Sequence, residues 1–227
     1  MPPLNLSHYF STGVEAFTAG RHCPLPRPVL QPHQVHGCRV AVVTRQDTPA
    51  SELEGIDALV CPRPDICIGV RTADCVPVLL YDPLARVTAA VHSGWRGTVQ
   101  RISLHTVETM CAIGAHPANI QAVIGPSISA ASFQVGPEVA QAFQQAQFPM
   151  QHILTDQGPR GNNMQGGLHI DLWQACRITL LQAGLADYNI HVSGQCTYQQ
   201  YQRFYSARRE GNHHNARNIN AIVMLES

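Results

Sequence analysis

The stretch Ala89–Thr98 reads AAVHSGWRGT and passes from an apolar run through a glycine-rich turn into a helical pattern. The free N–H groups and the dipole of a helix N-terminus favour an anion, and Arg96, between two glycines, can bind a phosphate or carboxylate with both arms of its guanidinium. His92 lies beside this candidate anion site as a possible metal ligand or acid/base. The alternative is a structural strand-to-helix turn with a capping serine, and the segment alone favours neither.

The pattern of apolar residues predicts an α+β fold. Runs rich in valine and isoleucine, bounded by proline, glycine or aspartate, predict eight strands: Arg39–Thr44, Ala58–Cys61, Ile66–Val70, Val76–Tyr81, Val87–His92, Ile120–Ile124, Ile190–Ser193 and Ile219–Leu225. Helical spacing predicts Val99–Ile113, Pro137–Phe148 and a helix between its N-cap Asp171 and Gly184. Because strands outnumber helices without strict alternation, we expect a single domain over residues 1–227, with mixed β-sheets flanked by helices.

Composition excludes several classes of protein. The chain is 44% hydrophobic and 13% charged, with 15 basic and 15 acidic residues, which argues against nucleic-acid or membrane binding driven by charge. The 15 basic residues are all arginine, so Schiff-base lysines and P-loop lysines are excluded. Eight cysteines without repeated spacing favour reduced thiols. With no signal pattern and no membrane-spanning apolar run, we expect a cytoplasmic protein.

Three polar segments at predicted strand ends contain the ligands of a candidate metal site. His36, Cys75 and His92 together form a CysHis2 set, and three protein ligands would leave a fourth position of zinc open for water or substrate. Because these residues lie far apart in the sequence, spacing alone leaves other interpretations open. Cys75 can be a buried thiol, and His36 a hydrogen-bonded loop histidine.

Two further features carry polar groups with more than one possible role. Asp74 can orient a ligand, act as a general base, or bond its own turn backbone. The stretch Arg203–Gly211 alternates like a strand, which would place Ser206, Arg208 and Glu210 on one face. That face can bind phosphate or form a solvated edge.

Seven motifs in the chain resemble those of the YfiH/YlmD family, the laccase-domain proteins related to human FAMIN. They are Gln34-Val35-His36-Gly37, Asp57-Ala58-Leu59-Val60, Thr72-Ala73-Asp74-Cys75-Val76-Pro77-Val78, Val91-His92-Ser93-Gly94-Trp95-Arg96-Gly97-Thr98, Ile124-Gly125-Pro126, Asp171-Leu172-Trp173 and Phe204-Tyr205-Ser206-Ala207-Arg208-Arg209. The resemblance extends from about Gln31 to Leu225.

The resemblance implies a YfiH-like α+β domain with a zinc site at His36, Cys75 and His92, which copper could also occupy. It implies a purine nucleoside phosphorylase acting on adenosine, inosine, guanosine and 5′-methylthioadenosine with phosphate, with adenosine deaminase activity besides. Asp74 and Cys75 are its candidate catalytic residues. We expect a monomer or weak homodimer.

The family also carries two other proposed activities. One is a copper-dependent polyphenol oxidase, although the chain has neither the His-x-His pairs nor the His-Cys-His run that a multicopper cluster requires. The other is a hydrolase that edits peptidoglycan precursors, with Cys75 as nucleophile.

Phosphate and substrate binding are expected to depend on arginine. The candidates are Arg71, Arg96, Ser206, Arg208 and Arg217.

The chain departs from the family pattern near its start. It has Phe10-Ser11-Thr12-Gly13 where members have Phe-Ser-Thr-Arg. If the family's arginine contacts phosphate, Arg21 or Arg71 would have to replace it. Gly125-Pro126-Ser127 stands where members have Gly-Pro-Cys, a position that we do not expect to ligate zinc.

Overall fold

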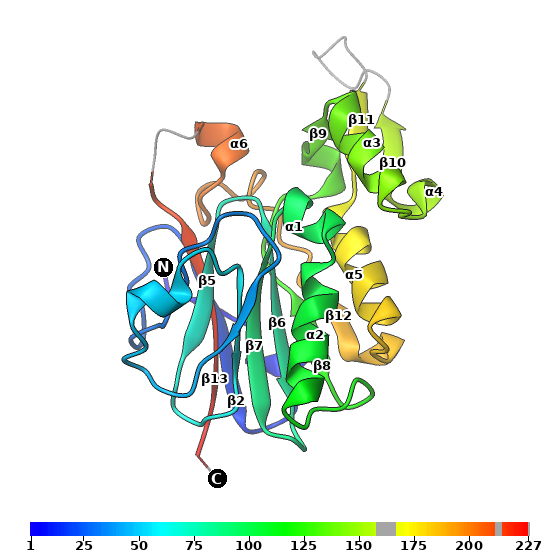
Figure 1. Ribbon diagram of the computed structural model, residues 1–227. Helices are drawn as coiled ribbons and strands as arrows, with labels where there is room; N and C mark the ends of the chain where they lie inside the picture. The colour runs from blue at the N-terminus through cyan, green and yellow to red at the C-terminus, as the bar shows by residue number, and fades with distance from the viewer. Residues whose placement is uncertain (158–166, 212–214, 227) are drawn as a thin grey trace.

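The computed structural model describes residues 1–157, 167–211 and 215–226 and is built around a six-stranded sheet (Figure 1). The strand order of this sheet is β12-β8-β6-β7-β4-β3. Its strands are β3 (Val40–Val42), β4 (Ala58–Cys61), β6 (Val76–Asp82), β7 (Val87–Ser93), β8 (Gln121–Ile124) and β12 (Ile190–Val192). The pairs β3–β4 and β12–β8 are parallel and the other pairs are antiparallel, so the sheet is mixed, as predicted.

The other strands form two smaller sheets. A four-stranded sheet has the order β1-β2-β13-β5, and a three-stranded sheet has the order β10-β11-β9. Their strands are β1 (Leu4–Asn5), β2 (Val14–Ala19), β5 (Ile68–Thr72), β9 (Gln134–Val135), β10 (Leu154–Gln157), β11 (Gly167–Ile170) and β13 (Asn218–Met224). The three-stranded sheet lies with α3 and α4 at one end of the molecule (Figure 1).

Helices cover one face of the central sheet. The α-helices are α1 (Trp95–Val99), α2 (Ile102–Ala112), α3 (Pro137–Gln145), α4 (Met150–Ile153), α5 (Leu172–Gln182) and α6 (Ala207–Glu210). Short 3-10 turns occupy Ser7–Tyr9, Ala50–Leu53, Ala130–Ser132 and Asp187–Asn189. Among the described residues, no helix combines the length and apolar character needed to cross a bilayer.

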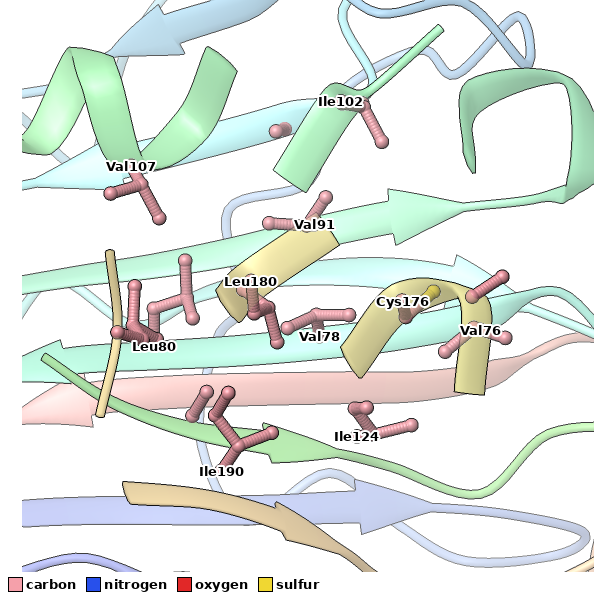
Figure 2. Packing of buried hydrophobic residues seen from close by; sticks show 14 of the residues in the cluster. Val76, Val78, Leu80, Val91, Ile102, Val107, Ile124, Cys176, Leu180 and Ile190 are labelled. Carbon is pink, nitrogen blue, oxygen red and sulfur yellow. The ribbon is translucent and has the colours of Figure 1, made fainter. Parts of the chain in front are cut away.

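The inner strands of the central sheet, β4, β6, β7 and β8, are buried on both faces, which explains their continuous apolar runs. Val76, Val78 and Leu80 of β6 belong to the cluster that packs under α2 and α5 (Figure 2). The intervening Leu79 and Tyr81 belong to a second cluster, shared with the four-stranded sheet. This alternation follows from the two-residue period of a strand. The result is three layers: the four-stranded sheet, the central sheet and the helices α2 and α5.

The predicted elements are confirmed with local differences. The eight strands predicted from apolar runs are present, with ends that differ by no more than two residues. The predicted helix Val99–Ile113 begins later, as α2 at Ile102, and Val99 instead ends the short helix α1, because Arg101 between them has a left-handed backbone, with φ 60°. Its guanidinium lies 3.6 Å from the centre of the Phe148 ring and donates to Gln182 Oε1 at 2.8 Å, contacts that favour the break.

Both predicted ends of the helix α5 are confirmed, whereas one end of α3 differs. Asp171 caps α5 by accepting from the N–H of Gln174 at 2.9 Å, and Gly184 after the helix has a φ of 92°. The predicted helix Pro137–Phe148 ends earlier, at Gln145.

Candidate metal centre

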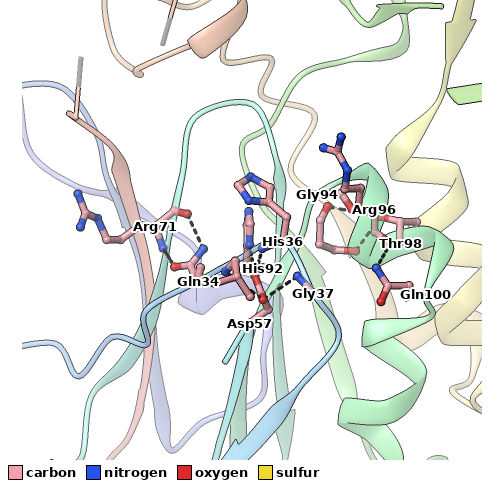
Figure 3. A network of polar contacts seen from close by, with 12 residues as sticks. Gln34, His36, Gly37, Asp57, Arg71, His92, Gly94, Arg96, Thr98 and Gln100 are labelled. Atoms are coloured by element: carbon pink, nitrogen blue, oxygen red, sulfur yellow. Dashed lines mark hydrogen bonds and ion pairs between the residues drawn. The ribbon is translucent and has the colours of Figure 1, made fainter. Parts of the chain in front are cut away.

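Strand register brings the three predicted metal ligands to one end of the central sheet, and Figure 3 shows two of them, His36 and His92. In the antiparallel pair β6–β7, Val76 lies opposite Ser93, so Cys75 emerges beside Gly94 and close to His92. His36 reaches the same place from the loop that precedes β3. The candidate ligand atoms of the three residues all lie within 4.8 Å of one another.

Both imidazoles face the Cys75 sulfur. His36 and His92 each hydrogen-bond to Cys75, and their rings meet edge to face with centroids 4.8 Å apart. His92 Nδ1 lies 2.7 Å from Asp57 Oδ1. Because an ionised carboxylate only accepts, Nδ1 carries a proton whether the ring is neutral or charged, and Nε2 is the nitrogen on the side of the Cys75 sulfur.

The electrostatics of the cluster favour a thiolate. Burial raises the pKa of Cys75, but the charge of His92 and the hydrogen bonds from both histidines outweigh it and lower the pKa to about 6. For His92, burial lowers the pKa, whereas the Cys75 thiolate and Asp57 raise it, to about 9. The cluster therefore supplies a deprotonated sulfur ligand near neutral pH.

The donor set and the available space fit a zinc ion. Zinc bonds of about 2.0–2.3 Å separate tetrahedral ligands by roughly 3.3–3.8 Å, and the candidate ligand atoms here lie within 4.8 Å of one another. A Cβ at Gly94 would lie 2.9 Å from Cys75 Sγ and 3.3 Å from His36 Cδ2, so only glycine leaves this space open. His92 is buried and His36 is exposed, which leaves one side of the cluster accessible to a substrate.

Asp74 connects the Cys75 loop to more distant segments. It is buried with a φ of 85°, and its carboxylate accepts from Thr197 Oγ1 and from the N–H of Arg208, each at 2.7 Å. The alternative in which Asp74 bonds its own turn backbone is therefore not what the structure shows. It holds the start of α6 beside the cysteine loop.

The predicted strand at Arg203–Gly211 is wrong. Residues Ala207–Glu210 form the helix α6, and the buried Ser206 is its N-cap, accepting from the N–H of Arg209 at 3.3 Å. A serine whose hydroxyl can satisfy a free helical N–H favours a cap over a strand at this position. Ser206 and Arg208 therefore do not share the face of a strand.

The predicted phosphate-binding arginines lie in different settings. Arg96 is exposed and stacks on Trp95, 4.4 Å from the ring centre, and it extends from α1 to the same end of the sheet as His36. Arg208 is exposed over Phe133. Arg71, by contrast, points away from the two histidines in Figure 3.

Local contacts engage three other arginines considered for phosphate binding: Arg71, Arg217 and Arg21. Arg71 donates to Asn215 O at 3.1 Å, and Arg217 donates to Ala216 O at 2.9 Å. Arg21 pairs with Glu210 and lies over Tyr205. Arg21 thus helps to anchor α6.

The sequence reasoning gave no role to Asp57, although it stands in one of the quoted motifs. Its side chain is fully buried and contacts the backbone N–H of His36 and the ring nitrogen Nδ1 of His92. An aspartate at the head of an otherwise apolar strand was the available signal, because a buried carboxylate requires several donors.

Comparison with known proteins identifies the family. A family model described as "Multi-copper polyphenol oxidoreductase laccase" matches residues 15–225. The chain belongs to this family. The expected YfiH/YlmD resemblance is confirmed: the crystal structure of YfiH from Bacillus licheniformis superposes with a TM-score of 0.76 at 27% identity, covering 87% of this chain and 74% of that one.

Curated relatives in this family carry names of purine enzymes. Adenosine deaminase RL5, from an unknown prokaryotic organism, is 44% identical over 189 residues, or 81% of this chain and 70% of the relative. A purine nucleoside phosphorylase from Bacteroides thetaiotaomicron is 39% identical over 194 residues, covering 82% of this chain and 70% of the relative. These relatives support an enzyme of this family.

Proposed function

We propose that this protein is a zinc-dependent purine nucleoside phosphorylase acting on adenosine, inosine, guanosine and 5′-methylthioadenosine. The observation that carries the proposal is the convergence of two imidazoles and one cysteine sulfur at an accessible sheet end. Relatives named purine nucleoside phosphorylase support the reaction class.

His36, Cys75 and His92 would hold the metal. Zinc bound there would supply a Lewis acid with an open coordination position. Copper binds such ligands more tightly than zinc, so protein prepared in the presence of copper would carry copper at this site instead of zinc. Under this proposal Cys75 acts as a ligand, and Asp74 positions the segment that carries Arg208.

The arginines would bind the phosphate. In phosphorolysis a phosphate oxygen bonds to ribose C1′ while the C1′–N9 bond breaks, and the purine leaves with the bonding electrons and takes up a proton. Arg96 and Arg208 can each hold the phosphate through two N–H groups. Within the part of the chain that the structure describes, no carboxylate forms an ion pair with either guanidinium.

Product analysis tests the proposal. Zinc-quantified protein would be incubated with adenosine, with and without phosphate, and the products separated by chromatography. Adenine and ribose 1-phosphate formed only with phosphate would support phosphorolysis. No turnover from fully zinc-loaded protein would contradict the purine assignment and favour cell-wall hydrolysis with Cys75 as nucleophile.

Adenosine deamination is a second candidate, because the relative at 44% identity is named adenosine deaminase. It predicts inosine and ammonia from the same incubation, with no phosphate requirement. A polyphenol oxidase, which the family description names, would instead form coloured products that depend on copper and oxygen. Anaerobic, copper-free incubation separates this outcome from the other two.

A further inference from the structure

We infer that Asp57 is the positioning residue of the metal centre, and that its single carboxylate orients both histidine ligands. This inference rests on the proposed metal site. Asp57 is fully buried and directly precedes β4, next to the strand that carries His92. It does not itself belong to the cluster of candidate ligands.

One set of contacts orients the His92 ring. Asp57 Oδ1 accepts from His92 Nδ1 at 2.7 Å, and the backbone oxygen of Asp57 accepts from the N–H of His92 at 2.8 Å. The ring is thus fixed through its side chain and its backbone. With Nδ1 protonated, only Nε2 is available to a metal, and its direction is set by the carboxylate.

A second set of contacts shapes the His36 loop. The N–H groups of three consecutive residues converge on the Asp57 carboxylate: Val35 at 3.2 Å, His36 at 2.9 Å and Gly37 at 2.8 Å (Figure 3). His36 has a φ of 62°, a left-handed conformation that few non-glycine residues adopt. The carboxylate stabilises this conformation and so determines where the His36 ring lies.

Asparagine at position 57 cannot reproduce these contacts. One oxygen would become an NH2 group that must face backbone N–H groups or a protonated imidazole nitrogen, donor against donor. We therefore expect Asp57→Asn to misorient at least one histidine while leaving the three ligands present.

Asp82 offers a matched control. It is also fully buried, and its carboxylate accepts three backbone N–H groups, from Leu84 at 2.9 Å, Ala85 at 3.0 Å and His116 at 2.8 Å. It lies at the opposite end of β6 from Cys75. Asp82→Asn should therefore cost stability without disturbing the ligands.

The test is metal affinity rather than turnover. Metal-free wild type, Asp57→Asn and Asp82→Asn would be titrated with zinc against a chromophoric chelator, and with cobalt to record the thiolate-to-metal and d–d absorption. We expect Asp57→Asn to bind zinc about 10–100-fold more weakly with an altered cobalt spectrum. Asp82→Asn should match the wild type in both. Equal zinc affinity and equal spectra for Asp57→Asn and wild type would overturn the inference, as would an equal loss in Asp82→Asn.

A measurement on the unaltered protein covers the case in which Asp57→Asn does not fold. Nitrogen-15 NMR of the zinc-loaded wild type should show His92 protonated at Nδ1 and ligated at Nε2. The opposite tautomer would overturn the inference. A wild type that binds no zinc would overturn the proposed metal site itself, a result distinct from zinc binding that ignores Asp57.

Discussion

Gly94 leaves the space that the Cys75 sulfur occupies in the candidate metal centre. Its backbone, with φ −65° and ψ 168°, suits any residue, so only space excludes a side chain. A Cβ there would lie 2.9 Å from Cys75 Sγ. We expect Gly94→Ala to push the sulfur from its position and weaken zinc binding at least about tenfold, an energetic cost of about 1.4 kcal/mol. Chelator competition measures this.

Gly136→Ala is the control for Gly94→Ala. Gly136 caps α3 with nearly the same backbone, φ −77° and ψ 166°, but the nearest atoms that a Cβ there would meet belong to the exposed, flexible Glu138 carboxylate. It should leave zinc affinity unchanged. Equal zinc affinity for Gly94→Ala and wild type would show that the sulfur does not occupy the described position.

Asp74→Asn distinguishes positioning from proton transfer. One of the two bonds, to Thr197 or to the Arg208 N–H, would lose its acceptor, so α6 would be held less well. We expect the KM for phosphate to rise roughly tenfold, as for one lost charge-assisted hydrogen bond, with kcat and zinc affinity nearly unchanged. Steady-state kinetics over a phosphate series measures this. A general base would instead show a kcat loss of about 10²–10⁴.

At the scale of elements, the N-cap of α5 contributes to stability separately from the metal site. Asp171 satisfies the N–H of Gln174, a group that water would otherwise have to satisfy. Asp171→Ala should lower the free energy of unfolding by about 1 kcal/mol, measured by urea denaturation, with zinc affinity unchanged. Unaltered stability would mean that the cap bond contributes nothing net.

The elements that could be predicted from the sequence are those whose signal is local. Ala58–Cys61 is an apolar run buried on both faces, and its strand bounds match the prediction. The helix break at Arg101 could not be predicted, because it depends on contacts with Phe148 and Gln182, which are distant in sequence. The cap at Ser206 was missed because alternating polar residues imitate a strand over a few positions.

At the scale of the whole molecule, the ligands were predicted from the family resemblance, whereas their convergence depends on tertiary structure. Cys75 and His92 meet because β6 and β7 pair in one register. His36 joins them through Asp57, a contact across 21 residues that no spacing rule reveals. Residue types predicted a possible zinc set, and only the fold brings its members together.

Metal binding should stabilise the entire fold, because the ligands come from three separate segments. Zinc at 100 times its dissociation constant should add about 2.7 kcal/mol to the free energy of unfolding and raise Tm by several degrees. Differential scanning calorimetry with zinc and with excess chelator measures the shift. Superimposable melting curves would contradict a specific site.

The most direct test of the account is the zinc dependence of phosphorolysis. Zinc would be titrated into metal-free wild type, His36→Ala and His33→Ala while adenine release from adenosine and phosphate is recorded. His33 is exposed, pairs with Glu54 and lies outside the ligand cluster, so its variant is the matched control. The account predicts adenine release that saturates at one zinc per chain in wild type and His33→Ala and is lost in His36→Ala. Full release without zinc, or unchanged release by His36→Ala, would contradict it.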